Sequence, residues 1–225
     1  MDYSVLEQFN LFEDINDDDL KVIYKVCNTQ VYSRDNMILI EEEFGNTLFL
    51  INKGKVKISR ISDDGREVIL SILSDGDFFG EMSIIDGMTR SANVVTLAET
   101  ELIILSREDF LRLIYQFPQL AINLLKELTA RLRRSDQHIK SLSLQDAVGK
   151  VASALLRLAE NSGTIKNGRV QITNVPAQQD LANMAGTSRE TISRAIKILY
   201  TDDYILKEGS TIIIKDYELF KATFS

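Results

Sequence analysis

The segment from Ser188 to Lys197, near the C-terminal end of the 225-residue chain, combines side chains that can read DNA bases. Gly186 before it can take a positive φ in a tight turn, and Ser188 is suited to cap a helix. Helical spacing buries the apolar residues and leaves a polar outer face, made of Arg189, Glu190, Ser193, Arg194 and Lys197. Arginine can donate two hydrogen bonds to guanine, and glutamate can accept one from cytosine. We therefore predict a recognition helix for the DNA major groove.

A solvated helix face with an ion pair between Glu190 and Arg194 is the alternative interpretation of this segment. The elements around it favour DNA binding. Helical patterns at 177–185 and 188–200 flank the turn, and Glu208-Gly209 joins two short apolar strands behind them. Two helices followed by a hairpin predict a winged helix-turn-helix.

A second polar group lies in the middle of the chain, in the segments Gly76-Asp77-Phe78-Phe79-Gly80-Glu81-Met82-Ser83 and Thr89-Arg90-Ser91-Ala92. Gly80 lets the backbone approach a ligand, and the first amides of a short helix beginning at Glu81 attract an anion. Arg90 can clamp a phosphate with two hydrogen bonds, Ser91 can donate a hydroxyl, and Glu81 can accept from a ribose hydroxyl. A turn with surface charges is the alternative; the β-rich surroundings favour a binding site.

Other kinds of site lack the residues that they need. Cys27 is the single cysteine, which excludes an internal disulfide and a multi-cysteine iron–sulfur or zinc site. His138 is the single histidine and lies outside the β-rich region, so we predict no haem and no metal centre. No carboxylate pair or nucleophile–base set indicates an enzyme.

Three regions must position the two polar groups. From Thr29 to Leu105, short apolar runs alternate with turn signals, of which Asp64-Gly65 is the clearest hairpin, and this pattern predicts an antiparallel β-roll, sandwich or barrel. Helical patterns precede it at Ser4–Val26 and follow it at Ser106–Phe117. We predict an α+β fold with a β-roll domain at 1–117, a long helix at 118–144 and a winged helix-turn-helix domain at 145–225.

The long helix has an apolar repeat with alternating spacings of four and three. Its members are Ala121, Leu125, Leu128, Leu132, Ser135, Ile139 and Leu142. Packing on its own domain would explain the spacing, but the stripe is narrow and flanked by charges, which favours a paired helix. We predict a homodimer through this helix.

Charge is divided unevenly between the regions. The net charge is −7, yet residues 1–117 hold 22 acidic and 11 basic side chains, whereas residues 145–225 hold 9 acidic and 10 basic ones. A DNA-facing surface in the C-terminal region is therefore electrostatically possible. The sequence contains no run of apolar residues long enough to cross a membrane and does not start like a secretory signal, so we predict a cytoplasmic protein.

The segment Ser188-Arg189-Glu190-Thr191-Ile192-Ser193-Arg194 resembles the recognition helix of the cyclic AMP receptor protein (CRP/FNR) family of bacterial regulators. The resemblance covers essentially the whole chain. It implies a dimeric transcription regulator that binds double-stranded DNA with TGTGA-type half-sites, and RNA polymerase as a partner. The base-reading residues implied are Arg189, Glu190 and Arg194, with Ser193 as a further contact.

The two segments Gly76–Ser83 and Thr89–Ala92 together resemble the phosphate-binding cassette of the same family, which implies a cyclic nucleotide, cyclic AMP, as allosteric effector. By resemblance, Glu81 holds the 2′-hydroxyl, Gly80 the sugar–phosphate region, and Arg90 with Ser91 the cyclic phosphate. Met82, Ser83 and Ala92 complete the cassette, and the dimer helix completes the pocket.

The dimer helix departs from the family pattern at one position. Members that bind cyclic AMP commonly place Thr followed by Ser or Asn against adenine, whereas this chain has Ser135 followed by Asp136. The carboxylate of Asp136 could accept from the adenine amino group, favour guanine, or bar the ligand through its desolvation cost. A regulator that needs no ligand, or that responds to cyclic GMP or cyclic di-GMP, is the alternative. A nucleotide-binding regulatory subunit of an enzyme is a further one, which the winged domain disfavours.

Overall fold

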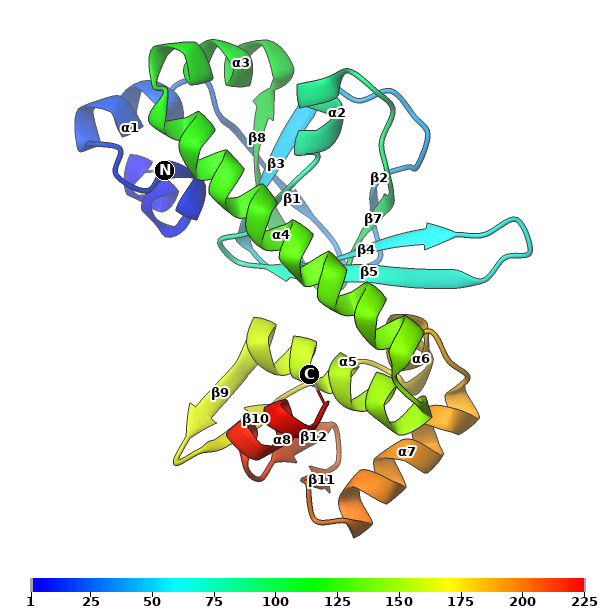
Figure 1. Ribbon diagram of the computed structural model, residues 1–225. Coiled ribbons are helices and arrows are strands. Elements are labelled where there is room, and N and C mark those ends of the chain that lie inside the picture. Colours follow the sequence, from blue (N-terminus) through cyan, green and yellow to red (C-terminus); the bar gives the residue numbers. More distant parts are fainter. Residues whose placement is uncertain (1, 225) are drawn as a thin grey trace. The chain divides into compact units, whose positions relative to one another are not determined.

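The computed structural model describes residues 2–224, which form two compact units. The N-terminal unit comprises the chain up to residue 65 together with residues 70–132. The C-terminal unit comprises residues 66–69 and the chain from residue 133. Helices and antiparallel strands occur in both (Figure 1), which confirms the α+β class. No helix within residues 2–224 is long and apolar enough to span a membrane.

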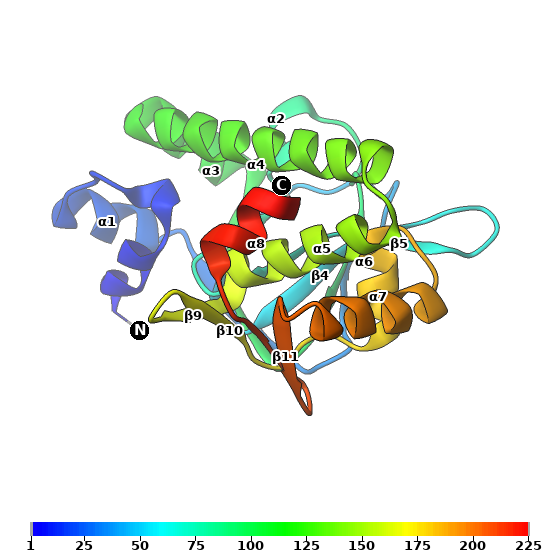
Figure 2. The same ribbon diagram turned by 60° about the horizontal axis from the view of Figure 1, so that its bottom comes forward.

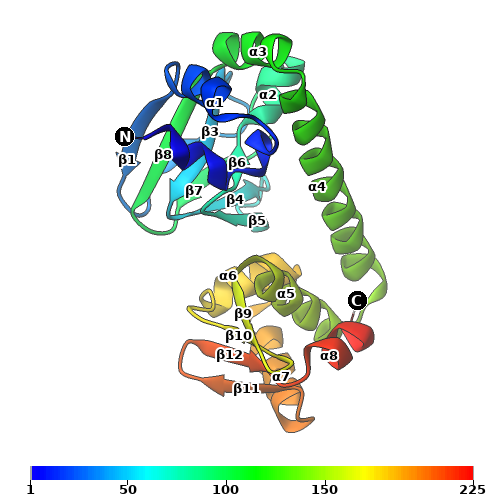
Figure 3. The same ribbon diagram turned by 90° about the vertical axis from the view of Figure 1, so that its left-hand side faces the viewer.

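The β-roll of the N-terminal unit consists of two four-stranded sheets (Figure 3), with strand orders β1-β8-β3-β6 and β2-β7-β4-β5. The predicted hairpin at Asp64-Gly65 joins β4 to β5, and Gly65 has a φ of +80° there. The strands are β1 (Asn28–Tyr32), β2 (Met37–Leu39), β3 (Thr47–Lys53), β4 (Lys55–Ile61), β5 (Glu67–Ser74), β6 (Phe78–Phe79), β7 (Asn93–Thr96) and β8 (Thr100–Ser106).

Apolar side chains of the strands fill the interior of the roll. Phe49 of β3 and Phe79 of β6 stack with ring centroids 5.1 Å apart, and Val56 and Leu102 are fully buried beside them. Burial of this apolar surface is the main force that holds the two sheets together. It also fixes β3 and β6, two paired strands of which β6 directly precedes Gly80.

Five short helices belong to the N-terminal unit: η1 (Tyr3–Gln8), η2 (Asn10–Phe12), α1 (Asp17–Tyr24), α2 (Glu81–Asp86) and α3 (Arg107–Gln116). Side-chain caps begin two of these helices: Asn16 accepts from the Asp19 N–H at 3.0 Å and Ser106 from the Asp109 N–H at 3.0 Å. Only the last part of the helical pattern at 4–26 is α-helix. The extended backbone of Phe9 interrupts it and leaves two 3-10 helices before α1.

The long helix α4 (Gln119–Leu144) is continuous, but the structure divides the predicted apolar repeat into two sets. Leu125, Leu132 and Ile139 are 63%, 63% and 61% exposed. Leu128 instead packs against the core of the N-terminal unit, and a Cβ on Gly186 would lie 2.9 Å from Leu142 Cδ2 in the C-terminal unit. Leu128 and Leu142 are partly buried and have neighbours within the chain, while pairing of two chains through this repeat stays a prediction.

The C-terminal unit has the predicted winged helix-turn-helix, and its hairpin β11–β12 pairs with β10 and β9 in one sheet, in the order β11-β12-β10-β9. Figure 2 shows α5, α6 and α7 grouped together in this unit. The elements are α5 (Ala147–Ser162), β9 (Gly163–Lys166), β10 (Arg169–Ile172), α6 (Gln178–Ala185), α7 (Arg189–Thr201), β11 (Ile205–Glu208), β12 (Thr211–Ile214) and α8 (Tyr217–Phe224). Helix α8 was not predicted, and its Phe220 packs against Tyr204 at 5.9 Å between ring centroids.

Candidate nucleic-acid interface and ligand site

The turn between α6 and α7 is set by Gly186. It has a φ of +60°, and its N–H donates to the Ala182 carbonyl at the end of α6. The N–H of Thr187 donates to the same carbonyl at 3.0 Å. Ser188 then caps α7 by accepting from the Thr191 N–H at 3.2 Å. The predicted turn glycine and cap are both confirmed.

Helix α7 buries one face and exposes the other. Ile192, Ala195, Ile196 and Leu199 are buried. Among the predicted DNA-binding residues, Thr191 is half-buried. The other six are exposed: Ser188, Arg189, Glu190, Ser193, Arg194 and Lys197. Bases in a groove can be reached only by such an exposed, rigidly held face.

Two of the predicted base-reading residues have local partners. Arg189 Nε donates to Gln178 Oε1 at 3.4 Å, a long bond that a better acceptor can replace. The pKa of Glu190 is lowered, first by the backbone N–H of its own residue and then by the Ser188 hydroxyl. Glu190 is therefore an ionised acceptor at neutral pH, the form that a hydrogen bond from a cytosine amino group requires.

Within the cassette, Gly80 directly precedes α2. Its φ of +85° suits glycine, and a Cβ there would lie 2.9 Å from the Thr47 carbonyl oxygen and from Arg90 Nη1. The backbone of β3 and the Arg90 side chain therefore pass directly over Gly80. The close approach seen at Gly80 is to the protein's own β3 and Arg90, and an approach to a ligand stays a prediction.

Arg90 is only 5% exposed and is held by three acceptors. Nη1 donates to the Gly80 carbonyl at 2.9 Å and to Ser83 Oγ at 2.7 Å, while Nη2 donates to the Thr47 carbonyl at 3.0 Å. Burial lowers the pKa of the guanidinium, and Glu81 partly opposes that shift. A guanidinium has five N–H donors, so Nε and the second Nη2 hydrogen stay available on one edge.

Gly45 lies against that edge of Arg90 and was not predicted as a residue of the site. A Cβ at this position would lie 1.9 Å from Arg90 Nε and 2.5 Å from Nη2. Only a residue without a side chain leaves this space to the guanidinium. The signal was absent from the sequence because Gly45 and Arg90 meet through the fold and not through spacing.

Glu81 is 4% exposed and has an ion-pair partner that the sequence did not indicate. Arg131 of α4 donates from Nη1 to Glu81 Oε1 at 3.1 Å and from Nη2 to the Phe78 carbonyl at 2.6 Å. Its guanidinium also lies 4.5 Å from the centroid of the Phe78 ring and pairs with Glu127 at 3.1 Å. The cassette is thus joined to α4 within the N-terminal unit.

The remaining predicted ligand residues lie in three different settings. Ser83 is buried under Arg90, and Ala92 is buried in the roll. Ser91 is exposed, with its hydroxyl 3.5 Å from the sulfur of Met82, which is also exposed. Ser135 and Asp136 belong to the C-terminal unit, where both are exposed on α4. The structure therefore brings together Gly80, Glu81, Ser83 and Arg90.

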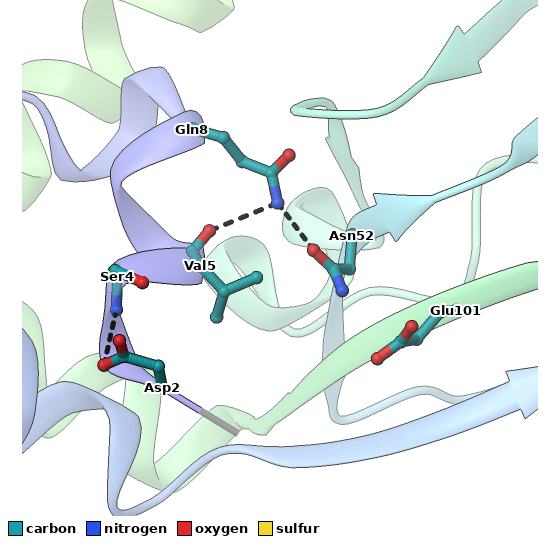
Figure 4. A pocket seen from close by; sticks show the side chains of 6 residues that line it. All are labelled: Asp2, Ser4, Val5, Gln8, Asn52 and Glu101. Carbon is teal, nitrogen blue, oxygen red and sulfur yellow. Dashed lines mark hydrogen bonds between the residues drawn. The ribbon is translucent and has the colours of Figure 1, made fainter.

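A hollow of about 460 Å³ lies apart from the cassette residues, beside η1 (Figure 4). Gln8 Nε2 bridges it by donating to Asn52 Oδ1 at 2.7 Å and to the Val5 carbonyl at 3.2 Å. Its lining is completed by Asp2, Ser4 and Glu101. Within residues 2–224, no group of three or more histidine, cysteine or acidic residues is placed to hold a metal ion.

Comparison with known proteins identifies the two kinds of domain in the chain. A family model described as a cyclic nucleotide-binding domain matches residues 29–117, and one described as a Crp-like helix-turn-helix domain matches residues 149–223. The chain is 32% identical over 214 residues to a CRP-like cAMP-activated global transcriptional regulator of Mycobacterium tuberculosis, covering 95% of this chain and 96% of that protein. The chain belongs to the CRP/FNR family of transcription regulators.

Two further relatives extend the CRP/FNR family match. The Cyclic AMP receptor protein of Thermus thermophilus is 33% identical over 211 residues, with 94% of each chain covered. The solved structure of FixK2 from Bradyrhizobium japonicum covers 89% of this chain and 98% of its own, with a TM-score of 0.77 at 21% identity, and so shares the fold. The chain is a transcription regulator with a DNA-binding helix-turn-helix and a cyclic nucleotide-binding domain, and its family consists of regulators and not of enzymes.

Proposed function

We propose that the chain is a homodimeric regulator that binds palindromic DNA with TGTGA-type half-sites and is controlled by cyclic AMP. The observation that supports the DNA part best is the exposed face of α7, where Arg189, Glu190 and Arg194 project from a capped helix. Arg189 and Arg194 are the proposed guanine readers and Glu190 the cytosine reader. Ser188, Thr191, Ser193 and Lys197 are proposed as further contacts to DNA.

The proposed dimer forms through α4. Leu125, Leu132 and Ile139 recur every seven residues and are exposed in the single chain, as the seam of a parallel helix pair requires. A two-fold dimer presents two recognition helices, which suits half-sites about one helical turn, roughly 34 Å, apart. RNA polymerase is proposed as the partner of the DNA-bound dimer.

The cassette fits the phosphate and ribose of a cyclic nucleotide. Two N–H donors on one edge of Arg90 remain for phosphate oxygens, the Ser91 hydroxyl is exposed, and the absence of a side chain at Gly45 keeps that edge of Arg90 clear. Glu81 is the proposed acceptor for the ribose hydroxyl, with Gly80 and Met82 beside it. A bound nucleotide supplies a negative charge and hydrogen-bonding groups. If one of two states of the protein binds these groups more tightly, the nucleotide shifts the population toward that state.

Ser135 and Asp136 are proposed as the groups that contact the base. They follow Arg131, the partner of Glu81, by four and five residues on the continuous helix α4. The exposed carboxylate of Asp136 supports a second candidate effector, because it can accept two hydrogen bonds from guanine N1–H and N2–H. Cyclic GMP and cyclic di-GMP are therefore the alternatives to cyclic AMP.

Calorimetric titration of the full chain with cyclic AMP, cyclic GMP and cyclic di-GMP tests the effector. We expect heat of binding with cyclic AMP, and its loss in Arg90→Ala. Binding of a guanine nucleotide but not of cyclic AMP would show that the effector is a guanine nucleotide. No heat with any of the three would contradict the proposal of a nucleotide effector. A gel shift with a TGTGA palindrome and a scrambled duplex tests the DNA proposal separately, and equal binding to both would contradict it.

A further inference from the structure

The C-terminal end of α6 leads directly into the turn that joins α6 to α7. The last four carbonyls of a helix have no partner inside the helix. In α6 the N–H groups of Gly186 and Thr187 both donate to Ala182, which leaves the carbonyl of Met184 to find another donor. That donor is Arg157 of α5, whose Nη2 lies 2.6 Å from the Met184 oxygen.

Arg157 lies in a largely buried stretch of α5. Its neighbours in α5, Leu156 and Leu158, are buried, and burial lowers the pKa of the guanidinium to about 10, with Glu160 opposing the shift in part. Keeping a charge in such surroundings is costly unless it is paired. The negative end of a helix dipole is a suitable partner, and Met184 carries it here.

Helix α4 places the imidazole of His138 beside the same carbonyl. Burial and the charge of Arg157 lower the pKa of His138 to about 4, and the Met184 backbone opposes that shift. His138 Nε2 is buried, with no hydrogen-bond partner among the described residues. One turn further along α4, Leu142 lies against Gly186. The last turns of α4 and the middle of α5 therefore meet at the turn of the helix-turn-helix.

We propose that Arg157 is a positioning residue for DNA recognition, because its bond to the Met184 carbonyl, with His138 packed beside it, fixes the turn from which α7 presents Arg189. The inference rests on the proposed role of α7 in reading bases. It goes beyond that role by placing part of the specificity in a residue that does not face DNA.

A packing role alone would predict a different result on substitution. Arg157→Met keeps the length and most of the apolar stem, so it removes the hydrogen bond and the charge while leaving most of the packing. Arg157→Lys keeps a donor and the charge. A positioning role therefore predicts that DNA specificity is lost in Arg157→Met and partly recovered in Arg157→Lys. A packing role alone predicts similar DNA specificity for both variants.

The test compares the full chain with Arg157→Met, Arg157→Lys and an exposed control, Arg169→Met. Fluorescence anisotropy with the TGTGA palindrome and with scrambled DNA gives the ratio of specific to non-specific affinity, at temperatures below each variant's melting point. We expect Arg157→Met to reduce that ratio about tenfold, the size of one base contact, and the control to keep it. Arg157→Lys should recover part of the loss.

The single histidine provides an independent readout, since His138 contributes the only imidazole signals in the NMR spectrum. Its pKa should rise in Arg157→Met, because a neighbouring positive charge is removed, and stay unchanged in Arg169→Met. If the parent discriminates between the two duplexes and Arg157→Met does so equally, the positioning role is wrong while the proposed function stands. If the parent does not discriminate, the proposed half-site is wrong and the positioning role falls with it. An unchanged His138 pKa would contradict the contact itself.

Discussion

The recognition helix and the cassette use arginine in opposite ways. Arg189 and Arg194 are exposed on α7, and the one local bond of Arg189 is a long one. Arg90 is buried and already satisfies three of its donors with the protein. The difference suits the proposed ligands: a DNA duplex approaches an exposed face from solvent, whereas a small anion is bound best by a group that is held in place before it arrives.

The largest effect is expected for Arg90→Ala. It removes a fixed positive charge and two aligned donors, so nucleotide affinity should fall about 100-fold or more. Calorimetry with cyclic AMP measures this loss. Arg34→Ala, an exposed arginine in the same unit, is the matched control and should bind as the parent does. Retained affinity in Arg90→Ala would show that the phosphate binds elsewhere and that Arg90 is not held in place for it.

Arg189→Ala should cost about 1–3 kcal/mol of specific binding and relax the preference at one base pair. Anisotropy with duplexes substituted at single positions measures both quantities. Lys197→Ala is the useful contrast, because a phosphate contact should weaken all duplexes to a similar degree. Unchanged discrimination in Arg189→Ala would show that the exposed face does not read bases through this residue.

Arg131→Met tests whether the cassette depends on α4. It leaves the buried Glu81 carboxylate without its partner, so the free energy of unfolding should fall by about 1–2 kcal/mol, less than for a fully buried pair because Arg131 is partly exposed. Thermal melting measures the change, with Arg133→Met, an exposed neighbour on α4, as control. Equal melting of the two variants would contradict a structural role for the Glu81–Arg131 pair.

Gly45→Ala should also weaken nucleotide binding. The new Cβ would lie 1.9 Å from Arg90 Nε, so a guanidinium that three hydrogen bonds hold would have to shift by more than its normal contact tolerance. Nucleotide affinity should therefore fall by about 1–3 kcal/mol, less than in Arg90→Ala because the positive charge is kept. Calorimetry beside Gly65→Ala, a hairpin glycine with open space around it, separates this clash from a general effect of losing a glycine. Unaltered binding would show that the edge of Arg90 facing Gly45 is not used.

Much of the recognition helix was predictable because its signals are local. Gly186, Ser188 and the spacing of Ile192 and Ile196 follow from turn chemistry, capping and the helical period, and the structure confirms each of them. The cassette was predictable only in part. Arg90 and Glu81 stand out by type, but their partners Thr47, Gly45 and Arg131 come from distant parts of the chain.

The apolar repeat of α4 shows that residue spacing alone does not predict which surface each residue packs against. Leu125, Leu132 and Ile139 fit a paired seam, and the structure exposes them. Leu128 has the same spacing but packs within its own unit, because a helix that serves both a core and a seam carries two overlapping stripes. Asp136 is exposed on α4, and its place relative to a nucleotide base stays a prediction.

The most direct test of the account measures DNA binding with and without effector. A TGTGA palindrome is titrated with the parent and with Arg90→Ala, each in the absence and presence of cyclic AMP, and anisotropy gives the four affinities. The account predicts that the nucleotide tightens binding by the parent about tenfold, within the usual range of allosteric coupling, and leaves Arg90→Ala unchanged. Equal affinity of the parent with and without cyclic AMP would contradict control by this nucleotide through the cassette.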